Sequence, residues 1–391
     1  MVGAVSLLAA SALSAYQVVS TSVTTPHPSL ERVSYEVQVG PSPLNRFSIT
    51  HVHKKCGRAD GSLILLSPFL LPGAFYEISE SGGYAKSAAG RLAESDIDVW
   101  LVDQRRTGLA PGACESGSAD CSVMGSWDFN ASSSDALFAL SLVKATHPRK
   151  KPVIGGFSAG SNAALATLNR APEEFSGLFL YEGTFYTEDP AIIAHNDTIC
   201  TNLTGALAAG SVYDPSAAVF GLVVRLATVD PNGVFPLPVF PPGTTNQQAL
   251  LYVFSAPPPP GALAPTPGFV RAIADFSTQQ LVYANQARLG LIGNLFDNYG
   301  SIAAVRDLSC GLAGRDDQHF DRVGEFRGDV LLFIEGTGFG PALFDTAGLF
   351  DQAASVTIDH NPELGESDPY FHKRWEQVFL KPLRTWLRRP L

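Results

Sequence analysis

The sequence is poor in charge and in metal-binding patterns. Charged residues make up 16% of the 391, and 37 acidic against 27 basic residues give a formal net charge of −10. No basic stripe is present to neutralise phosphates, which argues against a nucleic-acid partner. The five cysteines form no CxxC pair or other zinc spacing, so we expect neither metal nor cofactor. His51 and His53 are two residues apart, so both side chains would lie on one face of an edge strand. With Cys56 nearby they could bind a metal, but a solvent-exposed face is the better explanation.

The sequence also lacks an apolar run long enough to cross a membrane. Val2–Ala15 is apolar but shorter than the roughly 20 residues that a spanning helix needs. Small residues around Ala12 suit a signal peptidase, although no Lys or Arg precedes Arg32 to supply a positive start. We therefore predict a signal peptide within residues 1–20 and a secreted or extracytoplasmic protein. The alternative is a disordered or buried N-terminus.

The cysteines and the glycosylation sequons agree with export. Cys114 and Cys121 flank a short loop rich in Gly and Ser, as a small disulfide would. Pairing Cys200 with Cys310 would leave Cys56 free, but spacing alone does not fix the connectivity. Three sequons, which matter only in a host that glycosylates, begin at Asn130, Asn196 and Asn202.

Short β-rich runs alternate with helical patterns along most of the chain. The runs lie at 33–39, 47–52, 62–66, 97–103, 152–157, 177–182, 329–335 and 355–359. The first two alternate polar and apolar residues, whereas later ones are continuously apolar, as parallel strands buried on both faces are. Helical patterns occupy 84–94, 133–146, 159–169 and 371–387. This order predicts an α/β fold with a mostly parallel, eight-stranded, doubly wound sheet.

A long proline-rich stretch breaks this rhythm between the sixth and seventh predicted strands. Residues 186–328 interleave prolines with apolar residues such as Phe220 and Phe254. A structureless loop of this length is implausible, so we predict a partly helical cap or lid. The core would then consist of residues 30–185 and 329–391, and the cap would enclose an apolar substrate above the strand ends. A disordered insert is the alternative.

The strongest motif is Gly156-Phe157-Ser158-Ala159-Gly160. It follows an apolar strand and opens a helix of small residues, the strand–turn–helix setting of a nucleophile. Small residues on either side let the strand and helix approach while Ser158 holds a strained backbone. Ser158 is therefore the predicted nucleophile, and the Ala159 amide is the predicted first oxyanion donor.

Around this motif, residues 61–168 resemble the α/β-hydrolase superfamily, and locally its acid lipases and esterases. The segment from Asp98 to Arg105 resembles that branch's fourth strand and its arginine-containing turn, and Ser126-Trp127-Asp128-Phe129 resembles its Trp-Asp-Phe segment. The sequence departs from the family after the third strand, where Pro68-Phe69 replaces a His-Gly pair. If the oxyanion loop still functions, the Leu70 amide is the second donor.

The resemblance also implies a catalytic histidine after the last strand, which selects His360. The family often reads Gly-His-x-Asp there, however, while this chain has Gly365-Glu366-Ser367-Asp368. If that alignment holds, Glu366 replaces the histidine, and His372 is a weaker candidate.

The family's catalytic acid follows the seventh strand, where this chain has no carboxylate at the usual place. Some relatives keep the acid at the end of the sixth strand, which selects Glu182. Asp345 and Glu335 are the alternatives, and a hydrogen-bonded structural carboxylate is a further reading of Glu182.

These expectations describe a secreted serine hydrolase of the esterase or lipase type. A triad of Ser158, His360 and Glu182 would cleave a small apolar carboxylic ester. A peptidase or thioesterase on the same fold is one alternative. A catalytically silent binding protein is another, because of the Glu366 alignment and the missing His-Gly pair. The sequence does not specify the oligomeric state.

Overall fold

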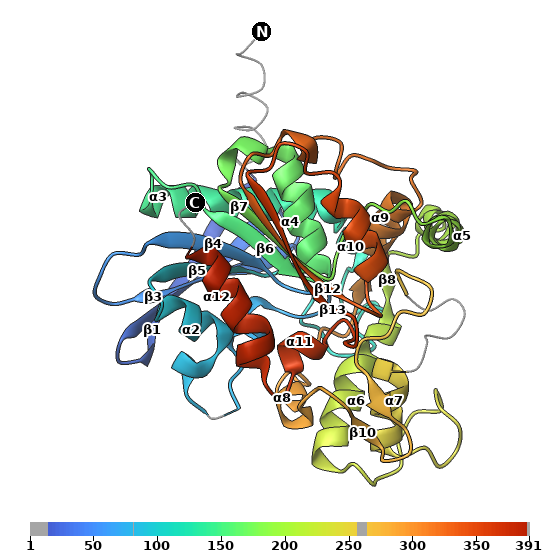
Figure 1. Cartoon of the computed structure of the whole chain (residues 1–391). Coiled ribbons are helices and arrows are strands. Elements are labelled where there is room, and N and C mark those ends of the chain that lie inside the picture. Colours follow the sequence, from blue (N-terminus) through green and yellow to red (C-terminus); the bar gives the residue numbers. More distant parts are fainter. Residues whose placement is uncertain (1–14, 81, 256–263, 389–391) are drawn as a thin grey trace.

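A nine-stranded sheet forms the centre of the molecule (Figure 1). The computed structural model describes residues 15–80, 82–255 and 264–388. In spatial order the strands are β1 (Tyr16–His27), β2 (Leu30–Val39), β3 (Arg46–Lys54), β5 (Ile97–Val102), β4 (Gly61–Leu66), β6 (Val153–Phe157), β7 (Gly177–Tyr181), β12 (Asp329–Glu335) and β13 (Ser355–Asn361). Strands β1, β2 and β3 are antiparallel, and the sheet is parallel from β5 to β13.

All eight predicted strands form, but the predicted total of eight is wrong because β1 was missed. Most β1 residues are exposed, so this edge strand has no buried apolar run to signal it. It also overlaps the predicted signal peptide. Residues 1–14 lie outside the described residues, whereas a boundary at residue 20 would fall inside β1, which pairs with β2 from Tyr16 onward.

Side chains alternate between two buried faces of the sheet. Leu63 and Leu65 of β4 pack on the face that carries α2 (Ala88–Ala93) and α12 (Lys381–Leu387). Ile64 and Leu66 pack on the opposite face with α3 (Phe129–Thr146), α4 (Ala159–Arg170) and α10 (Gly340–Ala347). Continuous apolar strands are needed because both faces are covered by helices.

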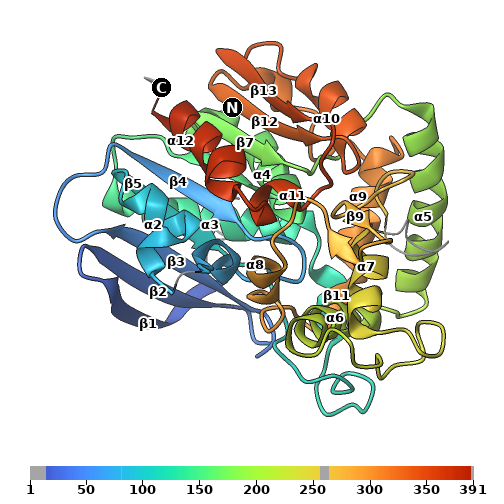
Figure 2. The ribbon, with the colours of Figure 1, turned by 60° about the horizontal axis from the view of Figure 1, so that its bottom comes forward.

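Between β7 and β12 the chain forms a helical insertion, residues 183–328. Its helices are α5 (Pro190–Ala208), α6 (Ala218–Val229), α7 (Asn246–Ser255), α8 (Gln286–Gly290) and α9 (Ile302–Leu312). Two short sheets accompany them, β8 (Tyr213–Asp214) with β11 (Gly300–Ser301) and β9 (Ala274–Asp275) with β10 (Gln280–Leu281). Figure 2 shows α5, α6, α7 and α9 together on one side of the sheet. After β13, α11 (Asp368–Phe371) leads to the C-terminal helix.

Both predicted disulfides are confirmed. Cys114 is bonded to Cys121, Cys200 of α5 is bonded to Cys310 of α9, and Cys56 is free and exposed. The second bond joins cysteines that are 110 residues apart in sequence. It links α5 to α9, the first and last α-helices of the helical insertion.

The three sequons differ in their surroundings. Asn202 is exposed on α5, and Asn130 is half-buried in the first turn of α3. Asn196 is fully buried, and its side-chain amide donates to the carbonyls of Ile192 and Pro265 at 2.9 and 2.8 Å. A glycan cannot be attached to a side chain enclosed in this way, so the expectation for Asn196 does not fit the folded chain.

Membrane spans were searched for in the part of the chain that the structure describes. No helix within residues 15–80, 82–255 and 264–388 is both long enough and apolar enough to cross a membrane.

Candidate active site

Ser158 lies at the turn between β6 and α4 with a strained backbone. Its φ of 54° and ψ of −125° are unusual for a residue with a side chain. A Cβ at Gly156 would overlap the backbone of Gly160, and one at Gly160 would overlap the carbonyl of Leu66. The strand and helix therefore meet as closely as they do only because both positions are glycine. Ser158 itself is half-exposed at this turn.

Hydrogen bonds fix the turn on both sides. The Ser158 amide donates to the Tyr181 carbonyl of β7 at 2.8 Å. The Ser161 hydroxyl, in the first turn of α4, donates to the carbonyls of Gly156 and Tyr181 and accepts from the Tyr181 amide at 2.8 Å. Several bonds thus compensate the strain at Ser158, which is how such conformations persist in functional sites.

Two backbone amides are candidates for an oxyanion hole. The Ala159 amide lies at the N-terminus of α4, where the helix dipole favours negative charge. Leu70 also has a positive φ of 65°, and its carbonyl accepts from the Asp297 amide at 2.8 Å. Among the hydrogen bonds of the described residues, none uses the amide of Ala159 or of Leu70 as donor. The role of both amides as donors remains a prediction.

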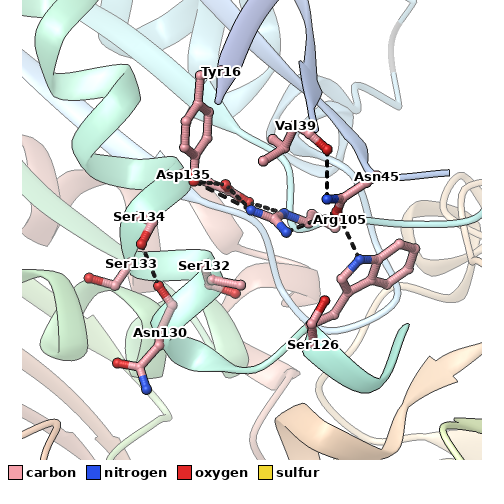
Figure 3. Close-up of polar contacts among 12 residues, drawn as sticks. Tyr16, Val39, Asn45, Arg105, Ser126, Asn130, Ser132, Ser133, Ser134 and Asp135 are labelled. Atoms are coloured by element: carbon pink, nitrogen blue, oxygen red, sulfur yellow. Dashed lines mark hydrogen bonds and ion pairs between the residues drawn. The ribbon is translucent and has the colours of Figure 1, made fainter. Parts of the chain in front are cut away.

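A buried ion pair anchors the loop that follows β5 (Figure 3). The Arg105 guanidinium donates to both carboxylate oxygens of Asp135 at 2.7 and 2.8 Å and to the Asn45 side chain at 2.9 Å. The Tyr16 hydroxyl donates to Asp135 at 2.8 Å, and the Trp127 indole donates to Asn45 at 3.0 Å. These bonds join β1, the β2–β3 turn, the loop after β5 and α3, so this cluster holds the framework of the site.

His360 lies within β13 rather than after it. The strand continues beyond the predicted end at residue 359 and stays in register with β12, with Ile334 opposite His360. Three strand spacings separate β13 from β6, about 14 Å at the usual distance between strands. The His360 side chain is exposed and packs against the Phe344 ring of α10 at 5.0 Å. The structure therefore does not bring the predicted base to Ser158.

Glu366 occupies the place that the histidine was expected to hold. Its side chain is 5% exposed, and it lies near enough to Ser158 for the hydroxyl to act on its carboxyl. Burial raises the pKa of Glu366, while Arg271 and the Ser158 hydroxyl act to lower it. The alignment of Gly365-Glu366-Ser367-Asp368 with the family's histidine segment stays a prediction, with which the nearness of Glu366 to Ser158 agrees.

Arg271 of the helical insertion is a site residue that the sequence did not reveal. Its guanidinium lies 5.0 Å from the Phe220 ring centroid and 5.2 Å from that of Phe269, and it donates to the Val253 carbonyl at 3.3 Å. Its charge acts on Glu366, to which no regular spacing in the sequence connects it. Only the folded insertion brings them together.

Glu182 and Glu335 form a buried pair of carboxyl groups at the ends of β7 and β12. Both side chains are fully buried, and Glu182 has a positive φ of 52°. Glu182 accepts from the Glu335 amide at 2.8 Å and from the Phe339 amide. Burial raises the pKa of Glu182 to about 7, and burial together with the Glu182 charge raises the pKa of Glu335 well above its usual range. Two adjacent buried carboxyls hold at least one proton between them at neutral pH.

None of the three acid candidates contacts His360 in the described structure. The Glu182 carboxyl oxygens accept hydrogen bonds from the Glu335 and Phe339 amides, as expected of a structural carboxylate. Asp345 accepts from the Thr187 hydroxyl at 2.8 Å and the Glu188 amide at 2.7 Å, so it fastens the start of the helical insertion. This position does not support Asp345 as the acid of a catalytic triad.

One cavity beside the predicted oxyanion loop is small. It has a volume of about 30 Å³, and Phe69, Leu70, Trp127, Arg106 and Tyr299 are among the residues that line it. That volume accommodates about one or two water molecules and not an acyl chain. Ser158 is not part of its lining.

Comparison with protein-family models gives no match, and comparison with curated proteins gives none either. Solved structures do match. A candidate lipase from Sulfolobus solfataricus aligns with a TM-score of 0.63 at 18% identity, covering 94% of this chain and 99% of its own. The chain has the α/β-hydrolase fold. A soluble variant of monoglyceride lipase from Saccharomyces cerevisiae aligns with a TM-score of 0.52 at 12% identity, covering 95% of this chain and 97% of its own.

In an α/β-hydrolase fold the turn after β6 is where a nucleophile is presented, and Ser158 stands there. The predicted α/β-hydrolase fold with its large, mostly parallel sheet is therefore confirmed. Sequence identities of 18% and 12% indicate a shared fold but not a shared function.

Proposed function

We propose that this chain is a serine hydrolase that cleaves carboxylic esters through an acyl-enzyme on Ser158. The observation that carries the proposal is the strained, half-exposed Ser158 at the start of α4. Strain of this kind costs about 1–3 kcal/mol, and it is found mainly where function requires it. The fold shared with lipases agrees with this reaction.

In the proposed reaction the Ser158 hydroxyl attacks the ester carbonyl and forms a tetrahedral intermediate. The negative charge develops at the N-terminus of α4, where the Ala159 amide and, from the facing loop, the Leu70 amide stabilise it. Collapse of the intermediate releases the alcohol and leaves the acyl group on Ser158. Water then hydrolyses the acyl-enzyme through the same oxyanion site.

For the substrate we propose an ester with an apolar acyl group. The helical insertion contributes Phe220 and Phe269, whose rings pack on Arg271 close to Glu366. The insertion is thus proposed to act as the cap over the site, as the sequence predicts. A secreted location agrees with two disulfides in the folded chain.

The nearness of Glu366 to Ser158 favours a second candidate function. If Gly365-Glu366-Ser367-Asp368 aligns with the family's histidine segment, a carboxyl group replaces the histidine. If Glu366 cannot activate Ser158, the chain is a binding protein on a hydrolase fold.

Hydrolysis of p-nitrophenyl esters of short and long acyl chains tests the proposal. We expect Ser158→Ala to lower kcat/KM by at least about 10³-fold, because no other group replaces the nucleophile. Ser141→Ala is the matched control, since Ser141 is exposed on α3 and bonds only the Phe138 carbonyl. Intact-mass detection of a fluorophosphonate adduct on wild type, absent from Ser158→Ala, gives a second readout. A wild-type protein that neither turns over esters nor forms the adduct supports the binding protein instead.

A further inference from the structure

Two segments distant in sequence bring six cations together at the surface. The cations are Lys54, Lys55 and Arg58, at the end of β3 and in the loop after it, and Arg149, Lys150 and Lys151, in the turn after α3. The Lys150 ammonium donates to the Ala59 carbonyl at 3.4 Å and to the Asp60 carbonyl, so the two segments lie side by side. They are about 90 residues apart in the chain, and only folding joins them.

Most of this positive charge has no acidic partner. Of the six cations, only Lys54 forms an ion pair within the part of the chain that the structure describes, with Asp96 at 2.7 Å. Asp60 is the only acidic residue in the stretches 54–60 and 147–151. A chain with a formal net charge of −10 therefore carries a locally positive surface here.

A cavity opens at this positive surface. Its volume is about 180 Å³, against about 30 Å³ for the cavity beside the predicted oxyanion loop, so it is about six times larger. Its charged and titratable lining consists of His53, Lys54, Arg58, Asp96, Asp98 and His147. Arg58 is exposed, which leaves the cavity open to solvent on that side.

The acidic groups of the lining are already compensated. The Asp98 carboxylate accepts from the rings of His51 at 3.1 Å and His147 at 2.6 Å. Burial raises the pKa of Asp98, but the hydrogen bonds and charges of these histidines outweigh burial and leave the pKa below its usual value. The other carboxylate, Asp96, is paired with Lys54. Neither acid is left to repel an anion without a partner.

The histidines of this region do not form a metal site. Within residues 15–80, 82–255 and 264–388, no group of three or more His, Cys, Asp or Glu side chains is placed to hold a metal ion. His53 pairs with Glu31 at 3.4 Å. His51 is buried and stacks on the Trp100 ring at 3.9 Å, so the solvent-exposed face expected for it is wrong.

We propose that this cavity binds a phosphate or sulfate monoester, with Arg58 as its charged anchor. No hydrogen bond or ion pair of the described residues engages the Arg58 side chain, and a guanidinium donates in parallel to two oxygens of such a group. The Lys54 ammonium has three donors and uses one of them on Asp96. The cavity is smaller than the roughly 300–1,000 Å³ of sites for drug-sized ligands, so it suits one small anionic group.

This site is separate from Ser158 and does not rest on the proposed function. Asp98 lies opposite Ser62 near the start of β5 and β4. Ser158 follows the last residue of β6, and the five residues of that strand span roughly 17 Å. The two sites therefore lie at opposite ends of the parallel strands.

The first test measures binding by titration calorimetry at low ionic strength. Wild type should bind glucose 6-phosphate and not glucose, which lacks the anionic group. We expect Arg58→Gln to raise Kd at least about tenfold, because it removes hydrogen bonds to a charged group. Arg327→Gln is the matched control and should bind as wild type. Arg327 is exposed and precedes β12, which is four strand spacings, roughly 19 Å, from β5.

A second pair of variants separates a built cavity from a diffuse positive surface. Ala59→Leu fills the cavity without changing any charge and should raise Kd at least about tenfold by excluding the ligand. Lys55→Gln removes an exposed charge outside the lining and should raise Kd no more than about threefold. If Ala59→Leu binds as wild type while Lys55→Gln weakens binding as much as Arg58→Gln, the cavity is not the site and the proposal is wrong.

A third test identifies the source of the anionic group. Phosphatidylcholine vesicles with and without phosphatidic acid, which also carries a phosphate monoester, are sedimented with wild type and Arg58→Gln. Calorimetric binding without sedimentation indicates a free small molecule, and sedimentation that needs both phosphatidic acid and Arg58 indicates a lipid headgroup. Either result supports the site, whereas a wild type that binds neither probe overturns it.

The outcome is independent of ester hydrolysis. Ser158→Ala should bind glucose 6-phosphate as wild type does, and Arg58→Gln should keep the wild-type rate toward p-nitrophenyl esters. If wild type is inert toward esters but binds the monoester, the proposed function fails and this site stands. Binding that is lost in Ser158→Ala contradicts the site, because Ser158 lies at the far end of the strands.

Discussion

Two buried polar clusters of this chain are built in opposite ways. In the first, Arg105 and Asp135 compensate each other's charge through two hydrogen bonds, and Tyr16 adds a third. In the second, Glu182 and Glu335 are carboxyls that face each other without a cation between them. Both oxygens of Glu335 lack a hydrogen-bond donor among the described residues.

The difference shows which cluster keeps its charges fixed and which can exchange protons. A compensated pair holds its geometry at any ordinary pH, and Arg105 with Asp135 ties four segments together. Uncompensated carboxyls gain and lose protons in the physiological range, as Glu182 does with a pKa of about 7. Glu366 lies at the edge of this second cluster, and its charge helps to raise the pKa of Glu182. Three predictions sharpen this comparison.

The largest effect is expected from breaking the compensated pair. Asp135→Ala should lower the free energy of unfolding by about 3–5 kcal/mol, because Arg105 would remain buried and uncompensated. Urea denaturation followed by circular dichroism measures the change. Replacing both residues, Arg105→Met with Asp135→Leu, should recover part of the loss. Asp351→Ala, at an exposed position, is the control, and an equal loss there contradicts the prediction.

A smaller effect is expected from the pH dependence of the carboxyl cluster. The pKa values of Glu182 and Glu335 are raised on folding, so their contribution to stability is fully present below the ordinary value of 4.5 and is lost as pH rises through about 7. The free energy of unfolding should therefore increase by about 1–3 kcal/mol when pH falls from 7.5 to 5, since one pKa unit corresponds to about 1.4 kcal/mol.

Glu335→Gln tests the origin of that pH dependence. The amide cannot ionise, so the variant should show a flatter rise in stability between pH 7.5 and 5, measured as the urea midpoint at each pH. Glu363→Gln should retain the wild-type slope because Glu363 is exposed. Stability that falls with acidity over this range counts against the protonated pair.

The smallest effect is expected from trimming the compensated cluster. Tyr16→Phe removes the hydroxyl that donates to Asp135 but keeps the ring that stacks on Phe138 at 5.0 Å. We expect a loss of about 1 kcal/mol, the usual net value of a hydrogen bond. Tyr186→Phe is the matched control, since its hydroxyl bonds the exposed Glu188. A neutral Tyr16→Phe would show that Arg105 alone compensates Asp135.

Much of the fold could be predicted because its signals are local. Continuous apolar runs such as 330–334 mark strands buried on both faces, and the glycines around Ser158 mark the turn that presents it. β1 escaped prediction because an exposed edge strand needs no apolar run. Both disulfides were predicted from loop context, although their connectivity required the structure.

The residues of the candidate site fall into the same two groups, those fixed by local sequence and those placed by packing. Ser158 and Ala159 are set by consecutive residues at one turn, so the sequence by itself determined where the proposed nucleophile stands. Whether His360 or Glu366 reaches Ser158 depends on where β13 ends. Where β13 ends depends on its pairing with β12 and on the hydrogen bonds from the Glu366 and Ser367 amides to the helical insertion. Both are contacts between residues distant in sequence. Only the tertiary structure could decide it, because the position of a side chain that comes from another element follows from packing and not from spacing.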